Sequence, residues 1–313
     1  MLQRLERIIL GSLVALIMTG AAAAQGGDKI KVLIVDGQNN HNWQATTPHL
    51  KKILEECGRF IVDVATAPPR PAAAKGKEID AEAQKKYKEE MAKFHPDFSK
   101  YDVVLSNYNG DEWPAETRKG LEEYLASGKG LVIIHAANNS FAGWIEYNRM
   151  IGMGWRNEKF GDRLTVDDQG KEVRVEKGQG PGAGHGPQHP FAVVVRNAEH
   201  PITHGMPREW MHAQDELYHG MRGPAQNVTL LATAFDDKAQ KGTGEHEPMI
   251  WTVSYGKGRV FHTPMGHDLT GMRCVGFITT VQRGTEWAAT GKVTIPIPDN
   301  FPTAKETRAA SSK

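Results

Sequence analysis

Apolar residues occur in short continuous runs in the first half of the chain, and amphipathic stretches separate most of these runs. Runs of this kind are typical of strands that are buried on both faces of a parallel sheet. Such strands are predicted at residues 30–36, 60–66, 101–107 and 130–135. Helical patterns lie between them at residues 47–57 and 114–127. This alternation predicts an α/β fold with a mostly parallel central sheet and helices on both faces.

The second half of the chain is less regular and richer in glycine. Further strands are predicted at residues 191–196, 228–235, 249–255 and 259–263. The segment Tyr255-Gly-Lys-Gly258 predicts a tight hairpin between the last two. A glycine-rich loop spans residues 152–190, and a long loop inside a compact domain usually has a function. We expect one α/β domain over residues 25–295 and a flexible C-terminal tail over residues 296–313.

The first 24 residues have the form of a secretory signal peptide. Arg4 and Arg7 precede an apolar run that ends near Met18, and the alanines at 22–24 provide a cleavage pattern before Gln25. The run is too short for an ordinary membrane-spanning helix, although an uncleaved membrane anchor is the alternative. We therefore predict an exported protein, periplasmic or secreted, with no stable membrane insertion after cleavage.

The charges of the chain balance, with 38 Lys and Arg against 37 Asp and Glu and a formal net charge of +1. Chains that bind nucleic acid usually carry a strong basic excess, so no nucleic-acid partner is expected. The sequence has no P-loop lysine motif, and no Gly-x-Gly-x-x-Gly follows the first strand. We therefore expect no nucleotide cofactor. The motifs Gly-x-Ser-x-Gly and His-Glu-x-x-His are also absent.

The chain contains two cysteines and thirteen histidines. Two cysteines exclude a disulfide-rich scaffold and a cysteine-rich zinc ribbon. In an oxidising compartment Cys57 and Cys274 could pair, and two separate buried thiols are the other interpretation. The thirteen histidines are more than an average chain of this length has, so their positions matter.

Histidine, asparagine and aspartate residues gather just after the predicted strands. In an open parallel sheet, ligands bind beyond the carboxyl ends of the strands, and these ends share one edge. Turn formation alone can explain Asn and Asp there, but histidine has no special preference for turns. The sequence therefore predicts a catalytic site in which His41, His135 and His267 converge. The residues expected to bind substrate around them are Asn42, Asn107, Asp111, Asn138 and Asp268.

Two further segments place histidine close to other polar groups. His185 and His189 are four residues apart, but the glycines and prolines around them forbid the helix that would align them as metal ligands. A loop that closes over a bound substrate is the other interpretation, and both residues are candidate substrate ligands. Asp215 and Glu216 are adjacent, so a strand would direct them to opposite faces. We expect Glu216 to act as an acid or base, with a solvated strand edge as the alternative.

Four short segments, taken together, resemble the trehalose-utilisation (ThuA-like) family. They are Val35–Trp43, Gly130–Ala136, Asp215–Tyr218 and Gly258–Asp268, and the resemblance covers residues 29–288. It implies a flavodoxin-like sheet similar to that of class I glutamine amidotransferases. Those proteins carry a nucleophilic cysteine in the turn after the fourth strand, where this chain has His135-Ala-Ala-Asn138. Because glutamine hydrolysis needs a cysteine thiolate, the chain is not expected to be a glutamine amidotransferase.

The resemblance also implies a carbohydrate substrate, either a disaccharide or a 3-keto sugar. A keto group acidifies the neighbouring C–H bond, so a histidine or carboxylate base could drive isomerisation or elimination. Trp43, Trp113 and Trp155 lie near the candidate loops, and aromatic faces commonly stack on sugars. A non-catalytic carbohydrate-binding protein that uses the same residues is the alternative. A divalent metal stays open as a cofactor.

Overall fold

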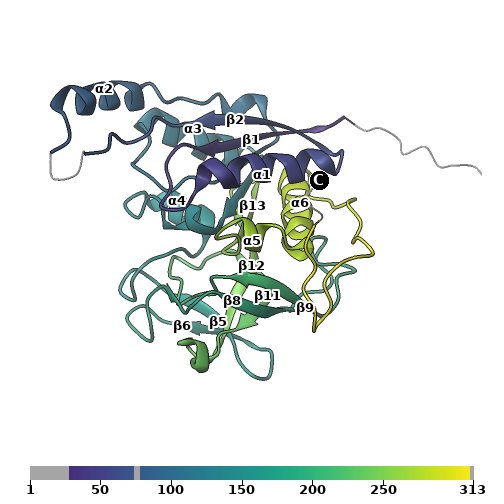
Figure 1. Cartoon of the computed structure of the whole chain (residues 1–313). Helices are drawn as coiled ribbons and strands as arrows, with labels where there is room; N and C mark the ends of the chain where they lie inside the picture. The colour runs from purple at the N-terminus through teal and green to yellow at the C-terminus, as the bar shows by residue number, and fades with distance from the viewer. Residues whose placement is uncertain (1–27, 74–77, 311–313) are drawn as a thin grey trace, which may run out of the picture.

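The computed structural model describes residues 28–73 and 78–310, so the predicted signal peptide lies outside the described residues. Within them the chain forms an 11-stranded sheet with helices packed against it (Figure 1). One half of this sheet is parallel. Its strands, in spatial order, are β2 (Phe60–Thr66), β1 (Ile30–Asp36), β3 (Val103–Ser106), β4 (Gly130–Ile134) and β13 (Gly258–Thr263). Numbered by their order in the chain, these five follow the 2-1-3-4-5 order of flavodoxin-type sheets.

The other half of the sheet is antiparallel. It continues from β13 through β12 (His246–Tyr255), β11 (Val228–Phe235), β8 (His189–Val195) and β9 (Glu209–Asp215), and β12 also pairs with β5 (Arg163–Val166), which pairs with β6 (Glu172–Val175). The hairpin predicted at residues 255–258 is confirmed, because β12 and β13 pair antiparallel across it. This hairpin reverses the strand direction, so the sheet is mixed. The prediction of a mostly parallel sheet is correct only for its first half.

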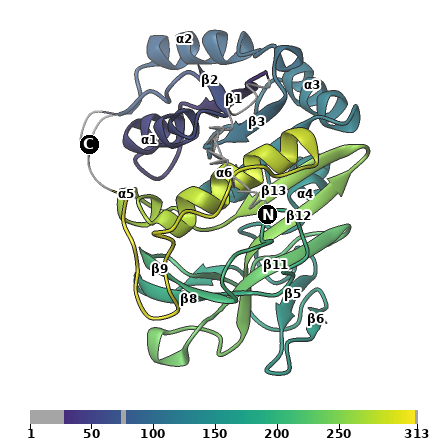
Figure 2. The same ribbon diagram turned by 90° about the vertical axis from the view of Figure 1, so that its right-hand side faces the viewer.

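Helices cover both faces of the parallel half (Figure 2). They are α1 (Trp43–Glu56), α2 (Ala81–Ala92), α3 (Ala115–Ala126), α4 (Ile145–Ile151), α5 (Leu269–Met272) and α6 (Val275–Thr290). Successive residues of β1 point to opposite faces, as in any strand. Val32 and Ile34 share one apolar core with α1 and α6, whereas Leu33 and Val35 share a second core with α2, α3 and α4. Because both faces are buried, residues 32–35 of β1 are all apolar.

The C-terminal segment packs against the domain up to the end of the described residues. The Phe301 ring is buried, with its centroid 5.5 Å from that of Trp210. The Met211 amide donates to the Thr303 carbonyl at 2.8 Å, and the Val275 amide donates to the carbonyl of Arg308 at 2.8 Å. The segment 296–310 is thus more firmly packed than the tail expected over residues 296–313.

No helix in the described part of the chain is both long enough and apolar enough to span a membrane.

Candidate functional site

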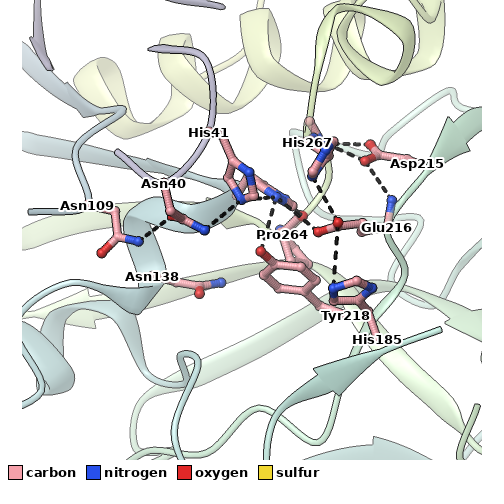
Figure 3. A network of polar contacts seen from close by, with 12 residues as sticks. Asn40, His41, Asn109, Asn138, His185, Asp215, Glu216, Tyr218, Pro264 and His267 are labelled. Carbon is pink, nitrogen blue, oxygen red and sulfur yellow. Dashed lines mark hydrogen bonds and ion pairs between the residues drawn. The ribbon is translucent and has the colours of Figure 1, made fainter. Parts of the chain in front are cut away.

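Four polar side chains from distant parts of the chain meet beside the carboxyl ends of the parallel strands (Figure 3). His41 lies in the turn between β1 and α1, His135 directly follows β4, and His267 lies between β13 and α5. Glu216 comes from the antiparallel half, directly after β9. The structure therefore brings together the three histidines and the carboxylate that the sequence singled out.

The distances within this cluster are short. His41 Nε2 lies 3.2 Å from His135 Nε2, and His135 Nε2 lies 3.5 Å from Glu216 Oε2. His267 Nδ1 lies 3.0 Å from Glu216 Oε1. Each of the four residues offers one nitrogen or oxygen atom, and these atoms all lie within 4.8 Å of one another. Side chains at such distances can share a proton, a substrate oxygen or a metal ion.

The backbone of His135 adopts an unusual conformation. Its φ is +45°, in the left-handed region that residues other than glycine seldom occupy. His135 begins the 3₁₀ turn η2 (His135–Asn139), and the buried guanidinium of Arg156 donates to the carbonyls of Asn138, Asn139 and Ser140 in and after this turn. Strained residues of this kind cluster at functional sites, where the surrounding structure holds them in place. Arg156 contributes that support here.

The ring orientation of His135 is fixed by its other nitrogen. Nδ1 lies 2.6 Å from the Pro264 carbonyl oxygen, which can only accept, so Nδ1 carries the proton and donates. The neutral ring then has its lone pair on Nε2, which faces the cluster. The Tyr218 hydroxyl lies 3.0 Å from this Nε2 and can donate to it.

Asp215 supports the cluster from behind. The residue is 1% exposed, and Oδ2 accepts from the Gly266 amide at 2.7 Å and from His212 Nε2 at 2.8 Å. Oδ1 accepts from the amides of Glu216 at 2.8 Å and His267 at 3.0 Å. One buried carboxylate thus ties together the two chain segments that carry Glu216 and His267.

The surroundings shift the protonation of the cluster. Burial, together with the neighbouring His135 and His267, lowers the pKa of His41 to about 4. Burial raises the pKa of Glu216, but its contacts with His135 and His267 outweigh burial and hold that pKa below its usual value. Contact with Glu216 raises the pKa of His267, although burial opposes the shift. Near neutral pH, His41 is therefore neutral and Glu216 ionised.

The glycine-rich loop brings a fifth polar group to the site. Its short strand β7 (Gly184–His185) pairs with β10 (Tyr218–His219), which places His185 Nε2 3.5 Å from Glu216 Oε1. The fully buried side chain of Arg222 holds the loop by donating to the carbonyls of Gly161, Glu176 and Pro181. His185 thus contacts the cluster through Glu216.

Three of the expected substrate ligands near the first and third parallel strands have structural partners instead. Asn42 caps α1, since its Oδ1 accepts from the Ala45 amide at 3.1 Å. Asn107 is buried and donates to the hydroxyls of Thr46 and Thr47 at 3.1 and 2.9 Å. Asp111 pairs with Arg70 at 2.7 Å and accepts from the Tyr87 hydroxyl, and so faces the segment between β2 and β3 that includes α2.

The other expected ligands lie at varying positions around the cluster. Asn138 is fully buried, with Nδ2 3.2 Å from His262 Nε2 and no partner for Oδ1 among the described residues. Asp268 caps α5 by accepting from the Thr270 amide at 2.6 Å. His189 Nδ1 lies 2.8 Å from the Pro187 carbonyl, and its ring packs beside Phe191 rather than in the cluster, with the two ring centroids 5.9 Å apart.

Of the three tryptophans, Trp155 contacts the site. Its ring centroid lies 4.6 Å from that of Tyr218, and the side chain is half-buried. Trp43 is the first residue of α1 and is half-buried, whereas Trp113 is 2% exposed inside the apolar core and has no free face for a sugar.

The sequence did not reveal the roles of Tyr218, Asp215 and the Pro264 carbonyl in the site. Tyr218 stood in one of the family segments, but only the fold reveals its partner.

Comparison with known proteins agrees with this fold. The family described as trehalose utilisation, ThuA, matches residues 31–288. The crystal structure of a ThuA-like protein from Parabacteroides merdae is 43% identical, with a TM-score of 0.81 over 90% of this chain and 98% of that one. A ThuA-like protein from Bacteroides uniformis, 19% identical with a TM-score of 0.54 over 87% of this chain and 96% of that one, shares the fold. No curated protein matches the sequence. The chain belongs to the ThuA trehalose-utilisation family.

Proposed function

We propose that the protein is an enzyme that acts on a disaccharide or a 3-keto sugar at the cluster of His41, His135, Glu216 and His267. The convergence of three histidines with a carboxylate carries this proposal. Sugar binding alone relies on amides, carboxylates and aromatic rings, whereas imidazoles suit proton transfer near neutral pH. Membership of a family described as trehalose utilisation supports a carbohydrate substrate.

The chemistry that suits this cluster is acid–base catalysis beside a keto group. A neutral imidazole, such as that of His41, removes the proton from the carbon next to the ketone, and the C–H electron pair forms an enolate. The enolate then expels the glycosidic oxygen, or is reprotonated at another position to give an isomer. In the elimination, the C–O bond breaks and the departing sugar oxygen takes a proton from an acid such as the imidazolium of His267.

Glutamine hydrolysis does not suit the site. The position after β4 holds His135 in its left-handed turn, and an imidazole does not replace the thiolate that this hydrolysis requires. Of the two cysteines, Cys57 ends α1 and Cys274 precedes α6. Both are free thiols.

The test is incubation of the purified protein with 3-keto-trehalose and 3-keto-glucosides, followed by product analysis with and without a chelator. We expect turnover in the wild type, its loss in His135→Ala, and no change in His204→Gln, which alters an exposed histidine outside the cluster. Circular dichroism confirms that each variant is folded. Binding of the sugars without turnover would refute the enzyme and support a carbohydrate-binding protein.

We also propose that the protein is exported to the periplasm or secreted, on the strength of Arg4, Arg7 and the apolar run that follows them. Mass spectrometry of the protein from intact cells is the test, and we expect a mature chain that begins at or near Gln25. A full-length chain retained in the membrane would refute export.

A further inference from the structure

The most unusual feature of the site is the approach of two imidazole nitrogens that both act as acceptors. Asn109 Nδ2 donates to Asn40 Oδ1 at 2.6 Å, which directs the Asn40 amide nitrogen toward His41 Nε2 at 3.4 Å (Figure 3). An amide nitrogen only donates, so His41 Nε2 is an acceptor. His135 Nε2 is an acceptor as well, because its Nδ1 donates to Pro264.

These two nitrogens lie 3.2 Å apart with a lone pair on each. Glu216 adds a carboxylate oxygen 3.5 Å from His135 Nε2, and this residue is 7% exposed. The Tyr218 hydroxyl can donate to the lone pair of His135 Nε2 alone, so the remaining electron-rich atoms repel one another unless a positive centre lies among them. The hydrogen bonds from Asn109 to Asn40 and from Asn40 to His41, together with the one from His135 to the Pro264 carbonyl, thus direct several lone pairs toward one point, where a cation can bind.

The spacing of the atoms agrees with metal coordination. Tetrahedral zinc sites have Zn–N bonds of about 2.0–2.1 Å, which puts neighbouring ligand atoms about 3.3 Å apart. His41 Nε2 and His135 Nε2 lie 3.2 Å apart. Glu216 places Oε2 3.5 Å from His135 Nε2 and Oε1 3.0 Å from His267 Nδ1, and one ligand atom from each of the four residues lies within 4.8 Å of the others. His135 donates its Nδ1–H to a backbone carbonyl, and metal-ligating histidines usually donate their other ring N–H in this way.

We propose that His41, His135, Glu216 and His267 bind one divalent transition-metal ion of the zinc class. Three imidazoles and one carboxylate suit Zn²⁺, Co²⁺, Ni²⁺ or Fe²⁺, whereas Mg²⁺ and Ca²⁺ prefer oxygen ligands throughout. The partial exposure of His267, at 21% of its side chain, leaves the site open on one side for an ion and a further ligand. This proposal does not depend on the sugar chemistry above, because its test measures metal binding.

An ion at this position changes which side chains can transfer protons. The four ligands no longer exchange protons freely, so the proton-transfer groups are His185, 3.5 Å from Glu216, and Tyr218, 3.0 Å from His135. The ion itself supplies Lewis-acid polarisation of a bound oxygen. The acid–base roles proposed for the cluster then pass to these two residues.

The experiment uses the full mature chain without a histidine tag, stripped with a chelator and dialysed. Zn²⁺ is titrated by calorimetry, and Co²⁺ is titrated in the visible spectrum, where tetrahedral coordination gives intense d–d bands. We expect one ion per chain for both metals and no binding of Mg²⁺ or Ca²⁺. In the His135→Gln/Glu216→Gln double variant, the affinity should fall by more than about 100-fold, since even outer-shell changes cost 10–100-fold.

The matched control is His204→Gln, which removes an exposed histidine that is not part of the cluster and should bind Zn²⁺ as the wild type does. If the double variant does not fold, His41→Gln replaces it, because His41 lies on a half-exposed turn and its loss removes one ligand without emptying the core. The proposal is overturned if the wild type binds neither ion, or if the folded ligand variant binds both with unchanged stoichiometry and affinity.

Discussion

Replacement of Asp215 by asparagine tests whether this buried carboxylate holds the segments of Glu216 and His267 in place. The change keeps the shape of the side chain but removes its charge and one of its two acceptor oxygens. In the wild type these oxygens accept from Gly266, His212, Glu216 and His267. An asparagine amide nitrogen in place of Oδ2 can donate to His212 only if that ring loses its Nε2 proton, and it leaves the Gly266 amide without an acceptor.

The cost follows from this count of hydrogen bonds. A buried donor left without a partner costs about 1–3 kcal/mol, and hydrogen bonds to a charged group exceed neutral ones by roughly 1 kcal/mol. We therefore expect Asp215→Asn to lower the free energy of unfolding by about 2–4 kcal/mol. For a domain of this size that corresponds to a fall in Tm of roughly 5–10 °C.

Urea and thermal unfolding at pH 6 measure this loss, and metal titration of the same variant provides a second reading. Because Asp215 positions the His267 backbone, the Zn²⁺ affinity should fall by about 10–100-fold. Asp237→Asn is the control, since the exposed Asp237 caps the short helix η3 (Lys238–Gln240) and asparagine caps equally well. An Asp215→Asn protein within about 0.5 kcal/mol of the wild type would refute the reasoning.

Three further outcomes follow from other parts of the structure. Burial lowers the pKa of His212, but its partner Asp215 outweighs burial and raises that pKa to about 9. The free energy of unfolding, measured in urea, should therefore contain the full contribution of this pair below about pH 6.5 and lose it as the pH rises through 9, and a flat profile would contradict the pairing. Gly276→Ala should lower the free energy of unfolding by roughly 1–3 kcal/mol, since the new Cβ would lie 2.3 Å from the Trp210 ring, and an unchanged Tm would speak against this close packing. Cys57 and Cys274 should both react with a thiol reagent after unfolding without reductant, whereas an intact mass 2 Da below the dithiol value would indicate a disulfide.

The sequence predicted strands rich in apolar and β-branched residues better than short or polar ones. Strands β1, β2 and β11 begin and end at the predicted residues, because such side chains make up most of each strand. Strand β9 was not predicted. Its buried positions include Trp210, His212 and Asp215, and the polar members of this set obscure the two-residue alternation.

Only the part of the site that lies on the parallel strands could be predicted from the sequence. The rule that ligands gather at the carboxyl ends of parallel strands led to His41, His135 and His267. It gave no way to tell that Asp111 would turn toward Arg70, because that partner comes from the loop that follows β2. Nor could it place Tyr218, whose position depends on the path of the antiparallel half.

The origin of the four cluster residues also has a consequence for how the protein folds. Three of them follow parallel strands, whereas Glu216 follows β9, at the far end of the antiparallel half. Contacts between segments so distant in the chain form slowly and require both halves to be in place. A chain with only its parallel half folded has no complete site, so a ligand of the cluster binds the finished structure alone. At a hundred times its dissociation constant, such a ligand adds about 2.7 kcal/mol to the stability of that structure and draws incomplete folding intermediates toward it.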